Sequence, residues 1–164
     1  MSGTNHLPPG TSAVTPYVCV RRCSAAIDWY AAVFGAVEDG PRYTDPDGRV
    51  GHAEIRIGDA RLMLSDAYPD HGAVAPEEGM ATATFALQIY VPDADATVAA
   101  AERVGAAVQR PVAETFYGDR MGTLLDPFGV RWMVGTHLRD VGADETAAAA
   151  ERFAQTGAEP GPVD

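Results

Sequence analysis

The chain has 164 residues and a mass of 17.3 kDa, the length of one domain or of two small halves that share a core. Its 23 acidic residues outnumber its 12 lysines and arginines and give a formal net charge of −11, which argues against nucleic-acid binding because that needs a basic surface. No apolar run reaches the roughly 20 residues of a membrane-spanning helix, and the first residues lack the pattern of a secretory signal. We therefore expect a cytoplasmic protein without a membrane partner.

The two ends of the chain differ in composition from its middle. Residues 1–14 are rich in Gly, Pro, Ser and Thr without periodicity, which predicts a disordered leader. Residues 138–164 predict a helix followed by a frayed tail, because acidic residues begin an alanine-rich run and Gly157 follows it. The expected folded domain is residues 15–137.

A strand and a helix are predicted at the start of this domain. The apolar run YVCV at 17–20 predicts a short strand. The run SAAIDWYAAVFGA predicts a helix that Ser24 caps and Gly35 closes. Its buried face is expected to hold Ile27, Tyr30, Val33 and Phe34.

Two alternating runs, HAEIRI and RLMLS, follow this helix and flank the dipeptide Gly58-Asp59. This pattern predicts a tight β-hairpin. After a loop at 66–80, a similar order begins again. TFALQIYV predicts a strand with Phe85, Leu87, Ile89 and Val91 on its apolar face, and ADATVAAAERVGAA predicts a second helix.

The chain contains an internal repeat with a spacing of 70 residues. Gly35 and Gly105 end the two predicted helices at this spacing, and ARLML then falls in register with VRWMV. We interpret the chain as two copies of a strand, helix and three-strand module, at about 15–66 and 82–137. Each copy is too small to bury its own sheet face, so the two are expected to share a core, within one chain or by exchange between two.

These segments resemble the vicinal oxygen chelate superfamily, which groups glyoxalase I, bleomycin- and fosfomycin-resistance proteins and extradiol dioxygenases. AIDWYAAVFGA resembles its first-helix signature, and LLDPFGVRWMV resembles its last hairpin. GHAEIRIGDARLMLSD and ETFYGDRMGTLLDPFGVRWMVGTH are most similar to the PhnB-like branch. The resemblance implies an α+β fold, with two βαβββ modules that form a curled eight-stranded mixed sheet around a cleft, and a homodimer.

Period-two alternation separates apolar, helix-facing residues from polar ones that would line the cleft. The apolar set includes Ala53, Ile55, Leu62 and Leu64. The expected ligand-binding residues come from the other face and from a polar turn at 117–120: Tyr17, Arg56, Arg61, Met63, Gln88, Tyr90, Tyr117, Arg131 and Met133. Two roles are open for that turn. In a structural role, Gly118 takes a positive φ and Asp119 bonds the turn backbone; in a functional role, the turn forms the rim of the cleft with Tyr117 as a lid.

The metal ligands of the superfamily align with Thr15, Met63, Ala86 and Met133. None of these is a His or a carboxylate, and thioethers suit soft ions rather than divalent oxygen-seeking ones. We therefore expect no metal and no other cofactor. A displaced divalent site that uses His52 and Glu54, on one strand face, with another histidine is the alternative, although a hydrogen-bonded polar pair is the simpler interpretation.

Two classes of function remain open at this point. In the first, the protein binds a small organic molecule in its cleft, in a resistance or sequestering role. In the second, it is an isomerase or lyase for a small carbonyl or carboxylate substrate, with Glu54 or His52 as the base and Arg61 or Arg131 as the oxyanion partner. Each arginine could instead pair with a neighbouring acid such as Glu54.

Overall fold

The computed structural model describes residues 6–8 and 10–156. The predicted leader at 1–14 lies partly outside the described residues, and the predicted tail after Gly157 lies outside them. The contacts divide the chain into two units, residues 1–78 and 79–164, and each unit is described by itself. No helix among the described residues is long and apolar enough to cross a membrane.

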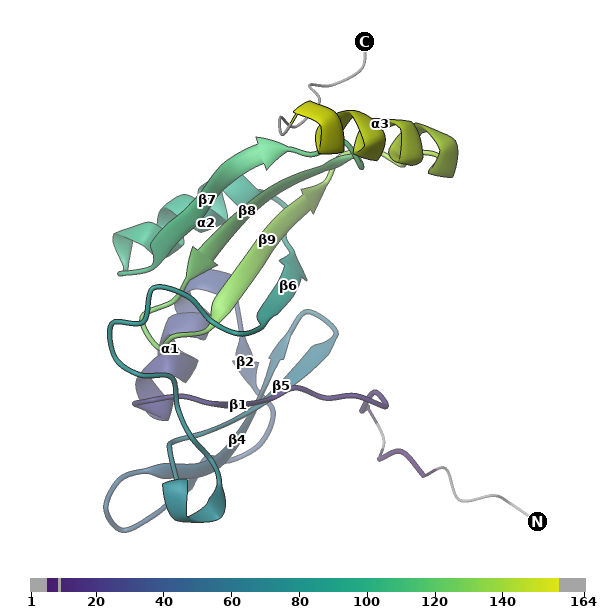
Figure 1. Cartoon of the computed structure of the whole chain (residues 1–164). Helices are drawn as coiled ribbons and strands as arrows, with labels where there is room; N and C mark the ends of the chain where they lie inside the picture. The colour runs from purple at the N-terminus through teal and green to yellow at the C-terminus, as the bar shows by residue number, and fades with distance from the viewer. Residues whose placement is uncertain (1–5, 9, 157–164) are drawn as a thin grey trace, which may run out of the picture. The chain divides into compact units, whose positions relative to one another are not determined.

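The first unit is a mixed sheet with one long helix (Figure 1). Its sheet order is β1-β5-β4-β2, with β3 also paired to β4; β1 runs parallel to β5, and the other pairs are antiparallel. A short 3₁₀ helix at Pro69–His71 follows the sheet. The elements are β1 (Tyr17–Cys19), α1 (Cys23–Phe34), β2 (Val37–Glu38), β3 (Tyr43–Thr44), β4 (Val50–Ile57) and β5 (Ala60–Ser65).

The second unit repeats this topology. Its sheet order is β6-β9-β8-β7, again with the first strand parallel to the last and antiparallel pairs elsewhere. The predicted repeat is therefore confirmed at the level of topology. The elements are β6 (Ala86–Tyr90), α2 (Ala94–Arg103), β7 (Ala107–Glu114), β8 (Asp119–Leu125), β9 (Arg131–His137) and α3 (Ala143–Thr156).

The predicted α+β fold class is correct, with five strands in one sheet and four in the other among the described residues. The first sheet has one strand more than the four expected of its module, because β2 and β3 both pair with β4 at different positions along it. Gly40, with a φ of 116°, and Pro41 separate these two short strands. Proline cannot donate a ladder hydrogen bond, so an edge strand breaks at such a point.

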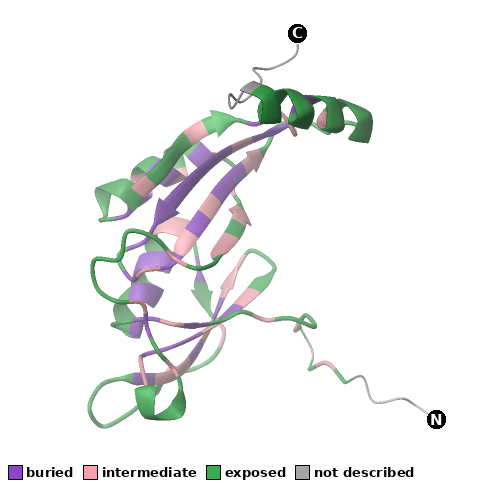
Figure 2. Cartoon of the chain, viewed as in Figure 1, coloured by how far each residue is buried: buried purple, intermediate pink, exposed green. Residues whose placement is uncertain are grey.

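The apolar residues of the alternating strands form the core, as predicted. Ala53, Ile55, Leu62 and Leu64 are buried in the first unit, and Leu124, Trp132 and Val134 are buried in the second. Strand β8 is buried along most of its length (Figure 2). The predicted apolar face of β6 is an exception. Leu87, Ile89 and Val91 are only partly buried, and Phe85 precedes the strand and is half exposed.

The prediction that Ser24 caps the first helix is wrong. Helix α1 begins at Cys23, after Arg22 in a left-handed conformation with a φ of 56°. The amide of Cys23 donates to the Asp66 carboxylate at 3.0 Å, so a distant side chain satisfies the helix start. Of the predicted buried face, Ile27 and Tyr30 are buried, whereas Val33 and Phe34 are only partly buried and Trp29 is buried in addition. The expected end at Gly35 is confirmed by its φ of 67°.

Candidate functional site

A chain of polar side chains crosses the sheet face of the first unit. Tyr17 Oη lies 3.2 Å from His52 Nδ1, and His52 Nε2 lies 3.3 Å from Glu54 Oε1. Strand register places Met63 opposite Tyr17 on one side and Glu54 on the other. These four residues (Tyr17, His52, Glu54 and Met63) are called the first-sheet face below, and all four were predicted as site residues.

Two arginines continue this chain. Arg61 Nη1 contacts Glu54 Oε2 at 2.9 Å, which is the ion pair with a neighbouring acid that the sequence left as the alternative. Arg61 Nη2 and Arg56 Nε both contact Asp39 Oδ2, each at 2.8 Å. The two predicted arginines are therefore brought together by Asp39, a residue that the sequence analysis did not single out. Both oxygens of Glu54 are engaged, one by Arg61 and the other by His52.

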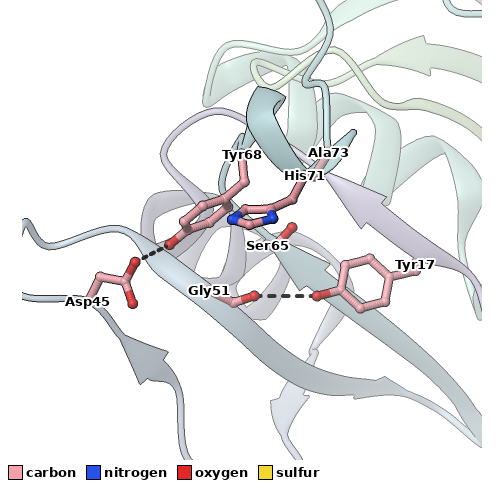
Figure 3. Close-up of a pocket in the computed structure, with 7 residues that line it drawn as sticks. All are labelled: Tyr17, Asp45, Gly51, Ser65, Tyr68, His71 and Ala73. Carbon is pink, nitrogen blue, oxygen red and sulfur yellow. Dashed lines mark hydrogen bonds between the residues drawn. The ribbon is translucent and has the colours of Figure 1, made fainter.

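A pocket of about 370 Å³ opens at the end of this sheet (Figure 3). The loop after β5 supplies Tyr68 and His71, and the loop before β4 supplies Asp45. Of the predicted ligand-binding residues, only Tyr17 lines this pocket. The full lining is Tyr17, Asp45, Gly51, Ser65, Tyr68, His71 and Ala73.

Tyr68 joins the two loops that border the pocket. Its phenol donates to Asp45 Oδ2 at 2.9 Å, and the Arg49 guanidinium lies 4.3 Å from the centre of its ring. The loop that carries Tyr68 is held by a backbone bridge between Tyr68 and Ala73. Removal from water and then the hydrogen bond to Asp45 raise the pKa of Tyr68 above its ordinary value, so this phenol stays protonated as a donor.

The second unit carries a separate polar cluster on its own sheet. Tyr90 Oη donates to Asp119 Oδ2 at 2.6 Å and accepts from Gln88 Nε2 at 3.1 Å. His137 Nδ1 lies 2.7 Å from Asp119 Oδ1. The hydrogen bond to Asp119, followed by that to Asp140, raises the pKa of His137 above its ordinary value. Gln88 and Tyr90 were predicted, whereas Asp119 was assigned to the turn.

That assignment of Asp119 is corrected by the structure. Gly118 has the expected positive φ of 90°, but the turn is closed by main-chain groups of Asp119 that bond Thr115. The Asp119 carboxylate is thereby free to hold Tyr90 and His137. Of the other predicted residues in this unit, Tyr117 contacts Met121 Sδ at 3.7 Å, and Arg131 donates to Gln109 at 3.0 Å.

The comparisons with known proteins identify the family. The model of the Glyoxalase/Bleomycin resistance protein/Dioxygenase superfamily matches residues 11–134. The chain belongs to this superfamily. It is 35% identical over 139 residues to the uncharacterized proteins Rv0887c of Mycobacterium tuberculosis and Mb0911c of Mycobacterium bovis, covering 84% of this chain and 81% and 91% of theirs.

Solved structures show the same fold. Protein PA1353 of Pseudomonas aeruginosa is 28% identical with a TM-score of 0.55, over 77% of this chain and 98% of that one. TioX of Micromonospora sp. ML1 is 22% identical with a TM-score of 0.56, over 78% of this chain and all of its own. The PhnB protein from Bacillus cereus is 18% identical with a TM-score of 0.59, over 76% of this chain and 99% of that one.

The metal positions of this superfamily do not carry suitable donors here. Register places Tyr17, rather than Thr15, beside Met63, and Gln88, rather than Ala86, beside Met133. Two thioethers, a phenol and an amide do not form the oxygen and imidazole set that binds hard divalent ions. Within residues 6–8 and 10–156, no three His, Cys, Asp or Glu side chains are grouped to hold a metal ion.

The sequence analysis missed Asp39, Asp45, Tyr68 and His71 as members of polar clusters. All four lie in connecting segments, where no periodicity predicts which way a side chain points. The signal that could have found Tyr68 and His71 is the composition of the loop at 66–80, which places two polar aromatic residues beside Pro69 and Gly72.

Proposed function

We propose that this member of the superfamily binds a small organic molecule against its first-sheet face and in the pocket beside it, without the metal of the superfamily. The pocket carries this proposal, because its volume is in the range of small-molecule sites and its lining combines aromatic rings with hydrogen-bonding groups. A resistance or sequestering role and a place in the PhnB-like branch are part of the same proposal. The sequence motifs of the two hairpins support the branch.

Native mass spectrometry of untagged protein, purified without chelator, tests this proposal first. We expect no stoichiometric divalent ion and retained organic mass, or stoichiometric uptake of a compound from a panel of cationic, neutral and anionic aromatic molecules that includes bleomycin. A stoichiometric divalent ion would overturn the metal-free part. Failure of every panel member to bind at millimolar concentration would overturn the binding function.

A pair of glycine variants then locates the site. A Cβ built at Gly51 would lie 3.5 Å from Tyr68 Oη, so Gly51→Leu extends into the pocket without a backbone clash. Gly142→Leu is the matched control, because nothing lies within 4 Å of its Cβ position. We expect Gly51→Leu to abolish binding of the panel compound and Gly142→Leu to retain it, with both variants folded by circular dichroism. Equal binding by both variants would place the ligand elsewhere.

The second candidate is an isomerase or lyase acting on a small carbonyl or carboxylate compound, with or without a displaced divalent metal. The hydrogen-bonded series Tyr17, His52, Glu54 and Arg61 favours it, since it places a carboxylate and an imidazole beside a guanidinium. The contacts of Glu54 with Arg61 and His52 weigh against it, because a substrate proton would have to compete with these two donors for the carboxylate. Glu54→Gln separates the candidates: it abolishes turnover in an enzyme but only changes affinity in a binding protein.

A further inference from the structure

We propose that the pocket between the loops at 45–51 and 65–73 selects an organic ammonium cation. This inference rests on the proposed binding function and names the class of ligand. It is carried by a single carboxylate that faces a pocket otherwise lined by aromatic and uncharged groups.

Asp45 provides the charge. Its Oδ2 accepts the hydrogen bond from Tyr68, and among the described residues Oδ1 accepts none. Oδ1 lies 3.9 Å from the position that a Cβ on Gly51 would take, and the absence of that side chain leaves the space beside the carboxylate open. Among the described residues that line the pocket, Asp45 is the only carboxylate and the only Asp, Glu, Lys or Arg. An ammonium group placed here would meet an oxygen with unused acceptor capacity.

Aromatic rings provide the second part of the recognition. Tyr17, Tyr68 and His71 line the pocket, and the Tyr68 and His71 rings lie 6.5 Å apart (Figure 3). Aromatic faces attract cations, quaternary ammonium groups in particular. The Tyr68 ring already holds one cation, because the Arg49 guanidinium lies 4.3 Å from its centre.

The charges around the pocket also favour a cation. Arg49 is paired with Asp47 at 2.7 Å, so the two carboxylates of this loop, Asp45 and Asp47, outnumber its one guanidinium. Arg56 and Arg61, two cations on the sheet face of this unit, are engaged by Asp39 and Glu54. The formal net charge of −11 adds long-range attraction for any cation.

The test compares choline with its neutral carbon isostere, 3,3-dimethylbutan-1-ol, in titrations followed by ¹H–¹⁵N NMR at constant, low ionic strength. We expect choline to shift the backbone amide signals of Tyr17, Gly51, Tyr68 and His71, with an affinity at least about tenfold higher than that of the alcohol. Asp45→Asn should lower choline affinity by about tenfold and leave the alcohol unchanged. Asp59→Asn, at the hairpin turn, removes the same charge away from the pocket lining and should change choline affinity by less than about twofold.

The other outcomes of this test distinguish the failure of the cation selectivity from the failure of the binding function. Equal binding of choline and the alcohol at these amides would overturn the cation selectivity and leave the binding function in place. An equal loss of choline affinity in Asp45→Asn and Asp59→Asn would also overturn it, because only the net charge would then matter. If neither compound shifted these amides, the cation proposal would fail, and the panel and the glycine variants would still decide the binding function by themselves.

Discussion

Asp126 is the residue on which the hairpin between β8 and β9 depends. Its buried carboxylate accepts from the amides of Phe128 and Val130, at 2.8 and 2.9 Å, and from Trp132 Nε1 at 2.9 Å. Asp126→Ala leaves these buried donors without an acceptor, so we expect the free energy of unfolding to fall by about 3 kcal/mol. Urea denaturation measures this change. Asp126→Asn keeps one acceptor oxygen, so its free energy of unfolding should fall by less. A decrease below about 1 kcal/mol in the alanine variant would contradict the assigned role.

His137 is expected to titrate above its ordinary pKa. Because its folded pKa is raised, the stabilisation it contributes is fully present below the unfolded pKa of about 6.5 and is lost as the pH rises through the folded pKa. NMR titration of the ring protons measures this pKa. Asp119→Asn should lower it more than Asp140→Asn, since the hydrogen bond to Asp119 is the larger cause. A wild-type pKa at or below 6.5 would contradict the expectation.

At the scale of elements, two glycines with positive φ are expected to differ in how well they tolerate alanine. Gly35 ends α1 with nothing within 4 Å of its Cβ position, so Gly35→Ala should cost about 1 kcal/mol of backbone strain. Gly118 lies under the segment that leads from β9 to α3, and a Cβ there would overlap the Arg139 carbonyl oxygen and lie 2.8 Å from Val141 Cγ2.

Gly118→Ala should therefore destabilise the protein by about 3 kcal/mol or more, since both strain and steric overlap apply. Urea denaturation of the two variants, side by side, measures the difference. Equal losses would show that the contact with Arg139 does not constrain this turn.

The helices also show which helix starts can be predicted from the local sequence. Asp93 caps α2 by accepting from the amide of Ala96 at 2.9 Å, and Asp144 and Glu145 lie in the first turn of α3, as its predicted acidic start requires. For α1 the local pattern favours Ser24, but the Asp66 carboxylate reaches the helix start from a residue 43 positions away. A long-range hydrogen bond of this kind leaves no local pattern in the sequence.

At the scale of the whole molecule, we expect a homodimer. This expectation rests on the resemblance of the helix and hairpin motifs to the vicinal oxygen chelate superfamily. Sedimentation equilibrium at micromolar concentration should give twice the chain mass of 17.3 kDa. A single species at 17.3 kDa would contradict this prediction.

The amino-acid sequence by itself determined most of the elements and the repeat, because hydrophobic periodicity and turn residues act over short distances. The α+β class and the superfamily came from the resemblance of its helix and hairpin motifs to a known family. Six of the predicted site residues share one sheet face because period two dictates it: Tyr17, His52, Glu54, Arg56, Arg61 and Met63.

Only the tertiary structure decided which partners those residues take. Asp39 holds the two arginines, Asp45 and Tyr68 border the pocket, and Asp119, at the start of β8, contacts His137 opposite it on β9. Each of these contacts joins segments whose relative position depends on strand register and loop path, and neither is encoded in local periodicity.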